Sequence, residues 1–300
     1  MKKIALIAGV VVLIGALLMV TGVGLGAKMY MYFDSEGAHV AKDEKEMLIS
    51  EELPENIANI DIDVIASDVE FISTENEYKI ELYNNRGRYN WSAEDGVLKI
   101  SEEKGYYRRF IMDLDFFRRR NPGNKIKIYL PDGAEFENVK LESKSGDFVL
   151  KGFRANTLNI YNIAGDVDIF NVEAGKMYVS LTSGDIDALN LIADSCDMKL
   201  VSGDVEISQI DIQSLNLRNI SGDFQARGKL RNSTISLTSG DVSLNLQGKN
   251  SDYKKDIDML SGDLYIDRVK TKNYGRDNFT AENSIKIEAT SGDVSLNFSE

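Results

Sequence analysis

Four successive stretches of the chain share one pattern. They are LNIYNIAGDVDI (residues 158–169), MYVSLTSGDIDA (177–188), CDMKLVSGDVEI (196–207) and LNLRNISGDFQA (215–226). In each stretch a Gly-Asp pair is flanked on both sides by residues that alternate between apolar and polar. This period of two predicts short β-strands with one buried face, and the glycine predicts a turn between them.

The same turn recurs at a nearly fixed interval through the second half of the chain. The turn glycines are Gly146, Gly165, Gly184, Gly203, Gly222, Gly240, Gly262 and Gly292. Their successive spacings are 19, 19, 19, 19, 18, 22 and 30 residues, and a degenerate ninth copy stands at residues 66–69. Residues 19 apart share a chemical type, so they are expected to stack in neighbouring rungs about 4.8 Å apart. An antiparallel hairpin meander could use similar turns, but the fixed register favours an all-β parallel β-solenoid, or β-helix.

Stacking also predicts how the turn glycines respond to substitution. Each is expected to need a positive φ, which penalises any side chain. A middle rung has two neighbours and an end rung has one. With rungs stacked in sequence order, the predicted cost of substitution falls from Gly203 to Gly146 to Gly292.

The N-terminal part of the chain is predicted to be a membrane anchor. Two lysines precede Ile4–Ala27, which holds 24 residues without a charge. As a helix this segment would span about 36 Å, more than the roughly 30 Å of a bilayer core. A cleaved signal peptide is the alternative. The lysines favour a cytoplasmic N-terminus, a single pass through the cell membrane and an extracytoplasmic C-terminal domain.

The predicted domain organisation has four parts. Residues 1–28 form the cytoplasmic tip and transmembrane anchor, and residues 29–54 form a polar stalk that holds the only histidine, His39. Residues 55–135 are expected to form an N-terminal β cap, because an uncovered end rung would present a bare strand edge. Residues 136–300 form the solenoid of about 19-residue rungs.

Composition excludes several classes of protein. The formal net charge of −13 argues against nucleic acid as a partner. The only cysteine, Cys196, falls in an apolar column with Leu158, Met177 and Leu215, and is expected to be buried. Uniform rungs leave no room for the loops that wall a catalytic cleft, so neither an enzyme nor a cofactor is expected.

One basic and aromatic stretch, residues 106–120, stands apart in this acidic chain. Its candidate partner-binding residues are Arg108, Arg109, Phe116, Phe117, Arg118, Arg119 and Arg120. They would suit an anionic partner such as lipid headgroups, a wall polymer or an acidic envelope protein. The alternative is an ordinary insertion whose aromatic side chains pack on the cap.

The turn aspartates should align along one edge of the solenoid. Neighbouring carboxylates at rung spacing repel each other by roughly 0.8 kcal/mol even in water. One compensation is that each carboxylate accepts backbone N–H groups within its own turn. The other is Ca²⁺ bound along a column of carboxylates, for which a three-residue turn supplies few ligands. The candidate calcium column is Asp166, Asp185, Asp204 and Asp223.

These features together resemble a known family. They are the Lys-flanked apolar segment, the strand and degenerate turn of Ile60–Phe71, the strand ending in Leu130-Pro131, and the train of Ser-Gly-Asp turns. Over residues 55–300 the chain resembles the "putative adhesin" family of bacterial surface proteins, a β-strand-repeat domain of unknown function. The resemblance implies a binding, adhesin-like or scaffold module of the cell envelope. The alternative role is a sensory or regulatory subunit in envelope-stress signalling.

Overall fold

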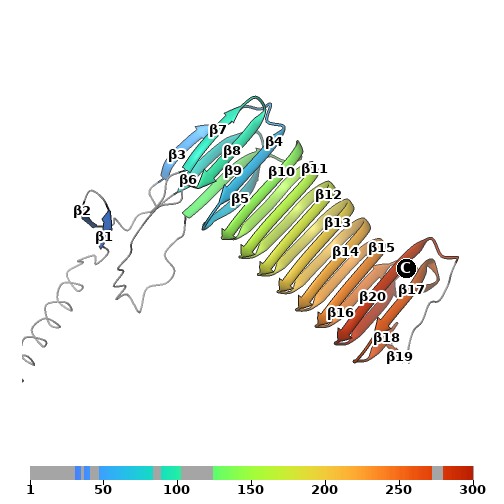
Figure 1. The fold of residues 1–300 in the computed structure, drawn as a ribbon. Helices are drawn as coiled ribbons and strands as arrows, with labels where there is room; N and C mark the ends of the chain where they lie inside the picture. Colours follow the sequence, from blue (N-terminus) through green and yellow to red (C-terminus); the bar gives the residue numbers. More distant parts are fainter. Residues whose placement is uncertain are drawn as a thin grey trace, which may run out of the picture. The chain divides into compact units, whose positions relative to one another are not determined.

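The computed structural model describes residues 31–34, 37–40, 47–83, 89–102, 124–271 and 280–299 (Figure 1). Across these ranges one 3-10 turn, η1 (Asn250–Asp252), is the only helical element, and the rest of the secondary structure is β-strand. The chain divides into two units, residues 1–45 with 105–121 and residues 46–104 with 122–300. In the first unit, β1 (Met31–Asp34) and β2 (Gly37–Val40) form an antiparallel hairpin.

The predicted anchor, Ile4–Ala27, and the side chain of His39 lie outside the described residues. Within the described ranges no helix is both long and apolar enough to cross a membrane.

The second unit is built on a stack of long parallel strands (Figure 1). These strands are β10 (Ala134–Ser145), β11 (Phe148–Ala164), β12 (Val167–Ser183), β13 (Ile186–Ser202), β14 (Val205–Ser221) and β15 (Phe224–Ser239). Each pairs with the next in parallel, so that Val167 faces Ile186 and Ile186 faces Val205, a register of 19 residues. The predicted all-β fold with parallel rungs is confirmed, and the hairpin meander is excluded for these strands.

Along each rung from β11 to β14, every second side chain points inward, except at two places where the interval between inward side chains is three residues. In β12 the buried apolar side chains are Val167, Ile169, Val172, Ala174, Met177, Val179 and Leu181. The first of these places falls at Asn171, whose φ of 54° bends the strand, and the second falls between Ala174 and Met177. Each rung therefore turns two corners within one strand and a third at its Gly-Asp turn, which gives it three sides around one apolar core.

At the Gly-Asp turns the backbones of neighbouring rungs come into contact. Seven of the eight turn glycines have φ between 118° and 141°, a conformation that favours glycine. A Cβ on Gly184 would lie 2.1 Å from the carbonyl oxygen of Gly165. Gly146 lacks a positive φ, but a Cβ there would still lie 2.3 Å from the carbonyl oxygen of Ser67. Close approach is therefore the common reason for glycine at this position.

The single 18-residue spacing in the repeat has a local cause. The register between β14 and β15 shifts between Ser208 and Ile210, so Gln209 has no counterpart in β15. Ile210 pairs with Gly228, whose φ of 139° makes the corner with one residue fewer.

The N-terminal end of the stack is a compact β cap. The degenerate copy of the repeat joins β4 (Asn59–Val64) to β5 (Ser67–Thr74), which pair in parallel with β10 and β11. Two strands lie parallel on the far side of this rung, β8 (Val97–Glu102) on β4 and β9 (Asn124–Pro131) on β5. The remaining cap strands pair antiparallel and are β3 (Met47–Glu52), β6 (Lys79–Tyr83) and β7 (Tyr89–Glu94).

At the C-terminal end the rungs do not stack in sequence order. The strands here are β16 (Val242–Gln247), β17 (Tyr253–Met259), β18 (Leu264–Ile266), β19 (Val269–Thr271), β20 (Asn283–Ser291) and β21 (Val294–Ser299). The rung β20–β21 lies between the rung β15–β16 and the rung β17–β18, with parallel pairing on both sides. The expectation that Gly292 marks an end rung is therefore wrong, because Gly262 occupies the outermost rung.

A lysine occupies a core position of this outermost rung. Lys255 aligns with the buried Ile285 and is itself only 2% exposed. Its Nζ donates to the carbonyl oxygens of Asn250 and Tyr253. Inward-pointing charges on edge strands disfavour pairing with further chains. Lys255 thus closes the apolar core where the stack ends.

Candidate interaction surfaces

The turn aspartates form a hydrogen-bonded ladder along one exposed edge of the stack. Asp166 Oδ1 accepts the backbone N–H of Asp185 at 2.9 Å, and Asp185 Oδ1 accepts that of Asp204 at 2.8 Å. The same bond links, in spatial order, Asp68, Asp147, Asp166, Asp185, Asp204, Asp223, Asp241, Asp293 and Asp263. The bond crosses from rung to rung, whereas the sequence led us to expect it within each turn.

Glu102 binds the backbone of the first rung next to the start of the ladder. Its Oε2 accepts the backbone N–H groups of Ile65 and Ala66 at 2.8 and 3.0 Å, and its Oε1 accepts an N–H of Asn124 at 2.9 Å. A carboxylate of the cap therefore satisfies two backbone donors at the start of the stack.

The ladder leaves its negative charge largely unpaired. The described residues place no lysine or arginine in an ion pair with a turn aspartate from Asp147 to Asp241, whereas Asp263 on the outermost rung pairs with Lys270 at 2.6 Å. Nor do these residues hold any group of three or more side chains that could bind a metal. The ladder bonds are hydrogen bonds of the first kind considered above, formed between rungs, and the calcium column of Asp166, Asp185, Asp204 and Asp223 stays a prediction that chelation can test.

A second acidic column runs beside the ladder. It consists of Asp168, Asp187 and Glu206, which face one another on β12, β13 and β14. Burial and the neighbouring carboxylates Asp187, Asp166 and Asp147 raise the pKa of Asp168 above its usual value. Burial and the carboxylates of Glu206, Asp185 and Asp166 likewise raise the pKa of Asp187. The local potential is therefore negative along this side of the stack.

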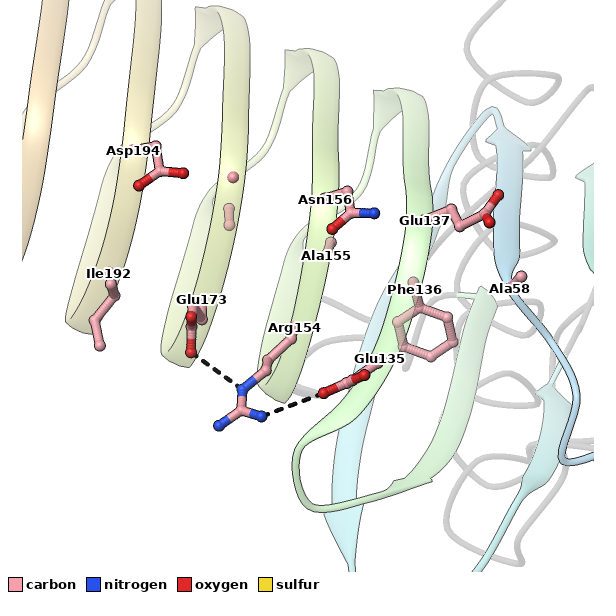
Figure 2. Close-up of a pocket in the computed structure, with 12 residues that line it drawn as sticks. Ala58, Glu135, Phe136, Glu137, Arg154, Ala155, Asn156, Glu173, Ile192 and Asp194 are labelled. Carbon is pink, nitrogen blue, oxygen red and sulfur yellow. Dashed lines mark hydrogen bonds and ion pairs between the residues drawn. The ribbon is translucent and has the colours of Figure 1, made fainter.

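A shallow groove of about 510 Å³ lies on another side of the stack (Figure 2). Arg154 on its rim bonds to Glu135 at 3.3 Å and to Glu173 at 3.1 Å, which ties three successive rungs together. Glu137 and Asp194 add two further carboxylates. The floor includes Phe136, Ala155 and Ala174. Exposed ion pairs of this kind contribute at most about 1 kcal/mol each, so they shape the rim more than they stabilise the fold.

A compact polar cluster lies on the cap around Glu81. Its carboxylate accepts hydrogen bonds from Lys79 at 2.7 Å and from the hydroxyls of Tyr83 and Tyr129 at 2.8 Å each. Burial alone would raise the pKa of Glu81, but these three donors outweigh it and lower the pKa to about 2. The cluster fastens β6 to β9, and its carboxylate stays ionised at neutral pH.

Two sequence-level candidates receive different outcomes. Cys196 is buried between Met177 and Leu215, and burial raises the pKa of its thiol to about 12, so it is an inert core residue. The basic-aromatic candidates between Arg108 and Arg120 lie outside the described residues, and their role stays a prediction.

Sequence reasoning missed the groove, the Glu81 cluster and the bonds of Glu102 to the first rung. The groove residues recur at 19-residue intervals, as Glu135, Arg154 and Glu173 do, so their alignment was readable from the repeat. The contacts of Glu81 and Glu102 depend on how the cap strands pair, and no repeat marks them.

The family model described as Toastrack DUF4097 matches residues 57–297. Among curated proteins no match was found. The assignment of the chain to a family therefore rests on this match.

The comparison with solved structures gave similar chains, and three of them differ in how well they superpose. A protein described as a putative adhesin from Bacteroides fragilis is 14% identical, with a TM-score of 0.52 over 85% of this chain and 99% of that one. A putative cell adhesion protein from Clostridium sporogenes is 12% identical, with a TM-score of 0.28 over 84% and 98%. A putative adhesin from Parabacteroides distasonis is 11% identical, with a TM-score of 0.43 over 83% and 95%. At these identities the first likeness concerns the fold alone, and the other two carry no further weight.

Proposed function

The chain belongs to the Toastrack DUF4097 family, and from that premise we propose that it is a membrane-anchored, extracytoplasmic binding or scaffold module of the cell envelope. The apolar segment Ile4–Ala27 would supply the anchor, and Lys2 and Lys3 would hold the N-terminus in the cytoplasm. Its partner would be an envelope protein or a wall polymer.

The observation that carries the proposal is the uniform surface of the central stack. From β11 to β14, side chains at one position of the repeat stand in unbroken columns, about 4.8 Å apart, on a continuous backbone ladder. Such a surface holds an extended partner at many points without ordering any loop, as other repeat proteins do. The turns between these strands carry no inserted loop that would wall a catalytic cleft, so the proposal assigns no enzymatic activity.

The topology can be tested with tags at both ends of the chain in intact cells. We expect added protease to remove a tag after Glu300 and to leave a tag before Met1 intact, because only the first would lie outside. Protection of the C-terminal tag would overturn the extracytoplasmic placement. The sensory alternative shares this topology but requires a stable membrane-protein partner, which crosslinking in intact membranes followed by pull-down would recover.

A further inference from the structure

An exposed apolar column runs beside the aspartate ladder. Ile163, Val201 and Ile220 each stand two residues before a turn glycine, and they are 53%, 46% and 54% exposed. Thr182 and Thr238 occupy the same position on the intervening and following rungs, and are exposed as well. Single exposed apolar side chains are common, but here three of four successive rungs place one at the same position of the repeat, which favours an interaction surface. We call this row, together with the turn aspartates next to it, the turn edge.

The charge of the turn edge selects the chemistry of its occupant. Each of Asp166, Asp185, Asp204 and Asp223 uses one oxygen for the ladder, and none has an ion pair within the described ranges. The second acidic column begins just after the same turns, on the adjoining side of the stack, where burial and neighbouring carboxylates raise the pKa values of Asp168 and Asp187. A cationic partner would relieve this repulsion, whereas anionic lipid, acidic wall polymer and nucleic acid would increase it.

The spacing of the turn edge selects the shape of its occupant. From Ile163 to Ile220 there are three rung steps, or about 14 Å. Three turns of an α-helix lying along the stack cover about 16 Å. If the helix carries one apolar residue per turn, each of these residues is therefore offset along the stack by no more than about 2 Å from the rung it faces. An extended strand lying in the same direction presents a side chain on the same face every two residues, and three such repeats cover about 20 Å. Its side chains would therefore not match the spacing of the rungs.

We propose that the turn edge of β11–β15 docks a basic amphipathic helix of a partner protein. The apolar face of the helix would lie on Ile163, Val201 and Ile220, and its flanking lysines or arginines would reach the ladder. This inference rests on the proposed binding function and names the class of partner. In this mode of binding, the helix packs on an apolar surface through one apolar side chain in each turn.

A designed peptide tests the inference on the full-length chain. The probe is an 18-residue helix with leucine once per turn on one face and lysine on both flanks. The matched control peptide keeps the leucines and replaces every lysine with glutamate. With the chain immobilised in uncharged detergent, surface plasmon resonance should detect the lysine peptide and not the glutamate peptide. Raising the salt concentration should weaken the binding, because exposed charges are screened.

Variants then locate the site. Replacing both Val201 and Ile220 with Ser should weaken binding at least tenfold, since each loses apolar contact without any change in the core. The matched control is Leu189→Ser, which removes a side chain that is 41% exposed at a different position of the repeat. Asp204→Asn with Asp223→Asn should also weaken binding and flatten its salt dependence. Asparagine keeps the Oδ1 acceptor of the ladder, so the unfolding midpoint should change little.

The inference is overturned if the glutamate peptide binds equally well, or if Leu189→Ser weakens binding as much as the Val201 and Ile220 changes. Absence of binding by the lysine peptide overturns it as well. These outcomes leave the cell-envelope function intact, because the protease experiment tests that function separately.

Discussion

Gly203 lies in the middle of the stack, and replacing it with alanine should destabilise the whole domain. A Cβ there would lie 1.9 Å from the carbonyl oxygen of Gly184 and 2.7 Å from its carbonyl carbon. An ordinary contact needs about 3.4 Å, so the two rungs would have to separate by roughly 1.5 Å at the turn.

That separation breaks three hydrogen bonds. They are Gly184 N–H to Ser202 O at 3.2 Å, Ile186 N–H to Asp204 O at 2.9 Å and Asp204 N–H to Asp185 Oδ1 at 2.8 Å. At about 1 kcal/mol each, the bonds cost about 3 kcal/mol. The φ of 141° adds about 1–3 kcal/mol of backbone strain for any residue with a side chain. The expected loss is therefore about 4–6 kcal/mol, a large part of the stability of an ordinary domain.

The matched control is Gly262→Ala, which creates the same 1.9 Å contact, with Gly292 O, on the outermost rung. That rung has another rung on one side only, and on its other side β18 pairs with just the short strand β19, so it can move away while the remaining rungs stay folded. Gly292→Ala should resemble Gly203→Ala, because its rung lies between two others.

The assay is urea unfolding of the full-length chain, followed by far-ultraviolet circular dichroism. We expect the main transition to shift strongly for Gly203→Ala and Gly292→Ala, and to stay in place for Gly262→Ala. Equal shifts for Gly203→Ala and Gly262→Ala, or a Gly203→Ala protein as stable as the parent, would refute the stacked-rung account.

Three further predictions follow from the surface. The pKa of Glu81 is about 2 in the folded chain, below its ordinary 4.5, so its contribution to stability is present above about pH 4.5 and is lost as the pH falls through 2. The stability gap between the parent and Glu81→Gln, measured by urea unfolding, should therefore be full at pH 7 and shrink below pH 4.5; a gap independent of pH would contradict this. Adding a chelator should lower the thermal midpoint by no more than a few degrees, because we expect no calcium on the aspartate ladder. Calcium bound only to the folded state would stabilise it by mass action, so a large drop on chelation would restore calcium to the ladder. Replacing Arg118, Arg119 and Arg120 with Ser should leave the unfolding midpoint unchanged and weaken binding to anionic vesicles in a flotation assay, and unchanged binding would make this stretch a structural insertion.

The repeating part of the fold was predictable because each rung restates the same physical requirement. An apolar residue at every second position and a glycine where two backbones meet are visible in one rung and verified by the next, as in Val167, Ile186 and Val205. The degenerate copy at Ser67-Asp68 was also found in this way, and it does start the ladder.

The two ends of the stack were less predictable because their pairings are not repeated. The rungs that hold Gly262 and Gly292 carry the same Ser-Gly-Asp signature, and nothing local says which of them contacts Gly240. The structure places Gly292 there. The direction of the aspartate hydrogen bond was missed for a related reason, since an Asx-type bond within a turn and a bond to the next rung require the same residue.

The exchanged order of the last two rungs has a consequence for biosynthesis. A chain emerging from its N-terminal end exposes residues 253–266 before residues 283–299, yet the later segment occupies the inner place. For that interval the edge of β15 and β16 is vacant, and the only matching segment at hand is the wrong one. Early docking of β17 and β18 on that edge would have to be undone before β20 and β21 could enter. The rung β17–β18 would thus compete for the edge that β20 and β21 finally occupy, and its release from that edge would limit how soon a new molecule is complete.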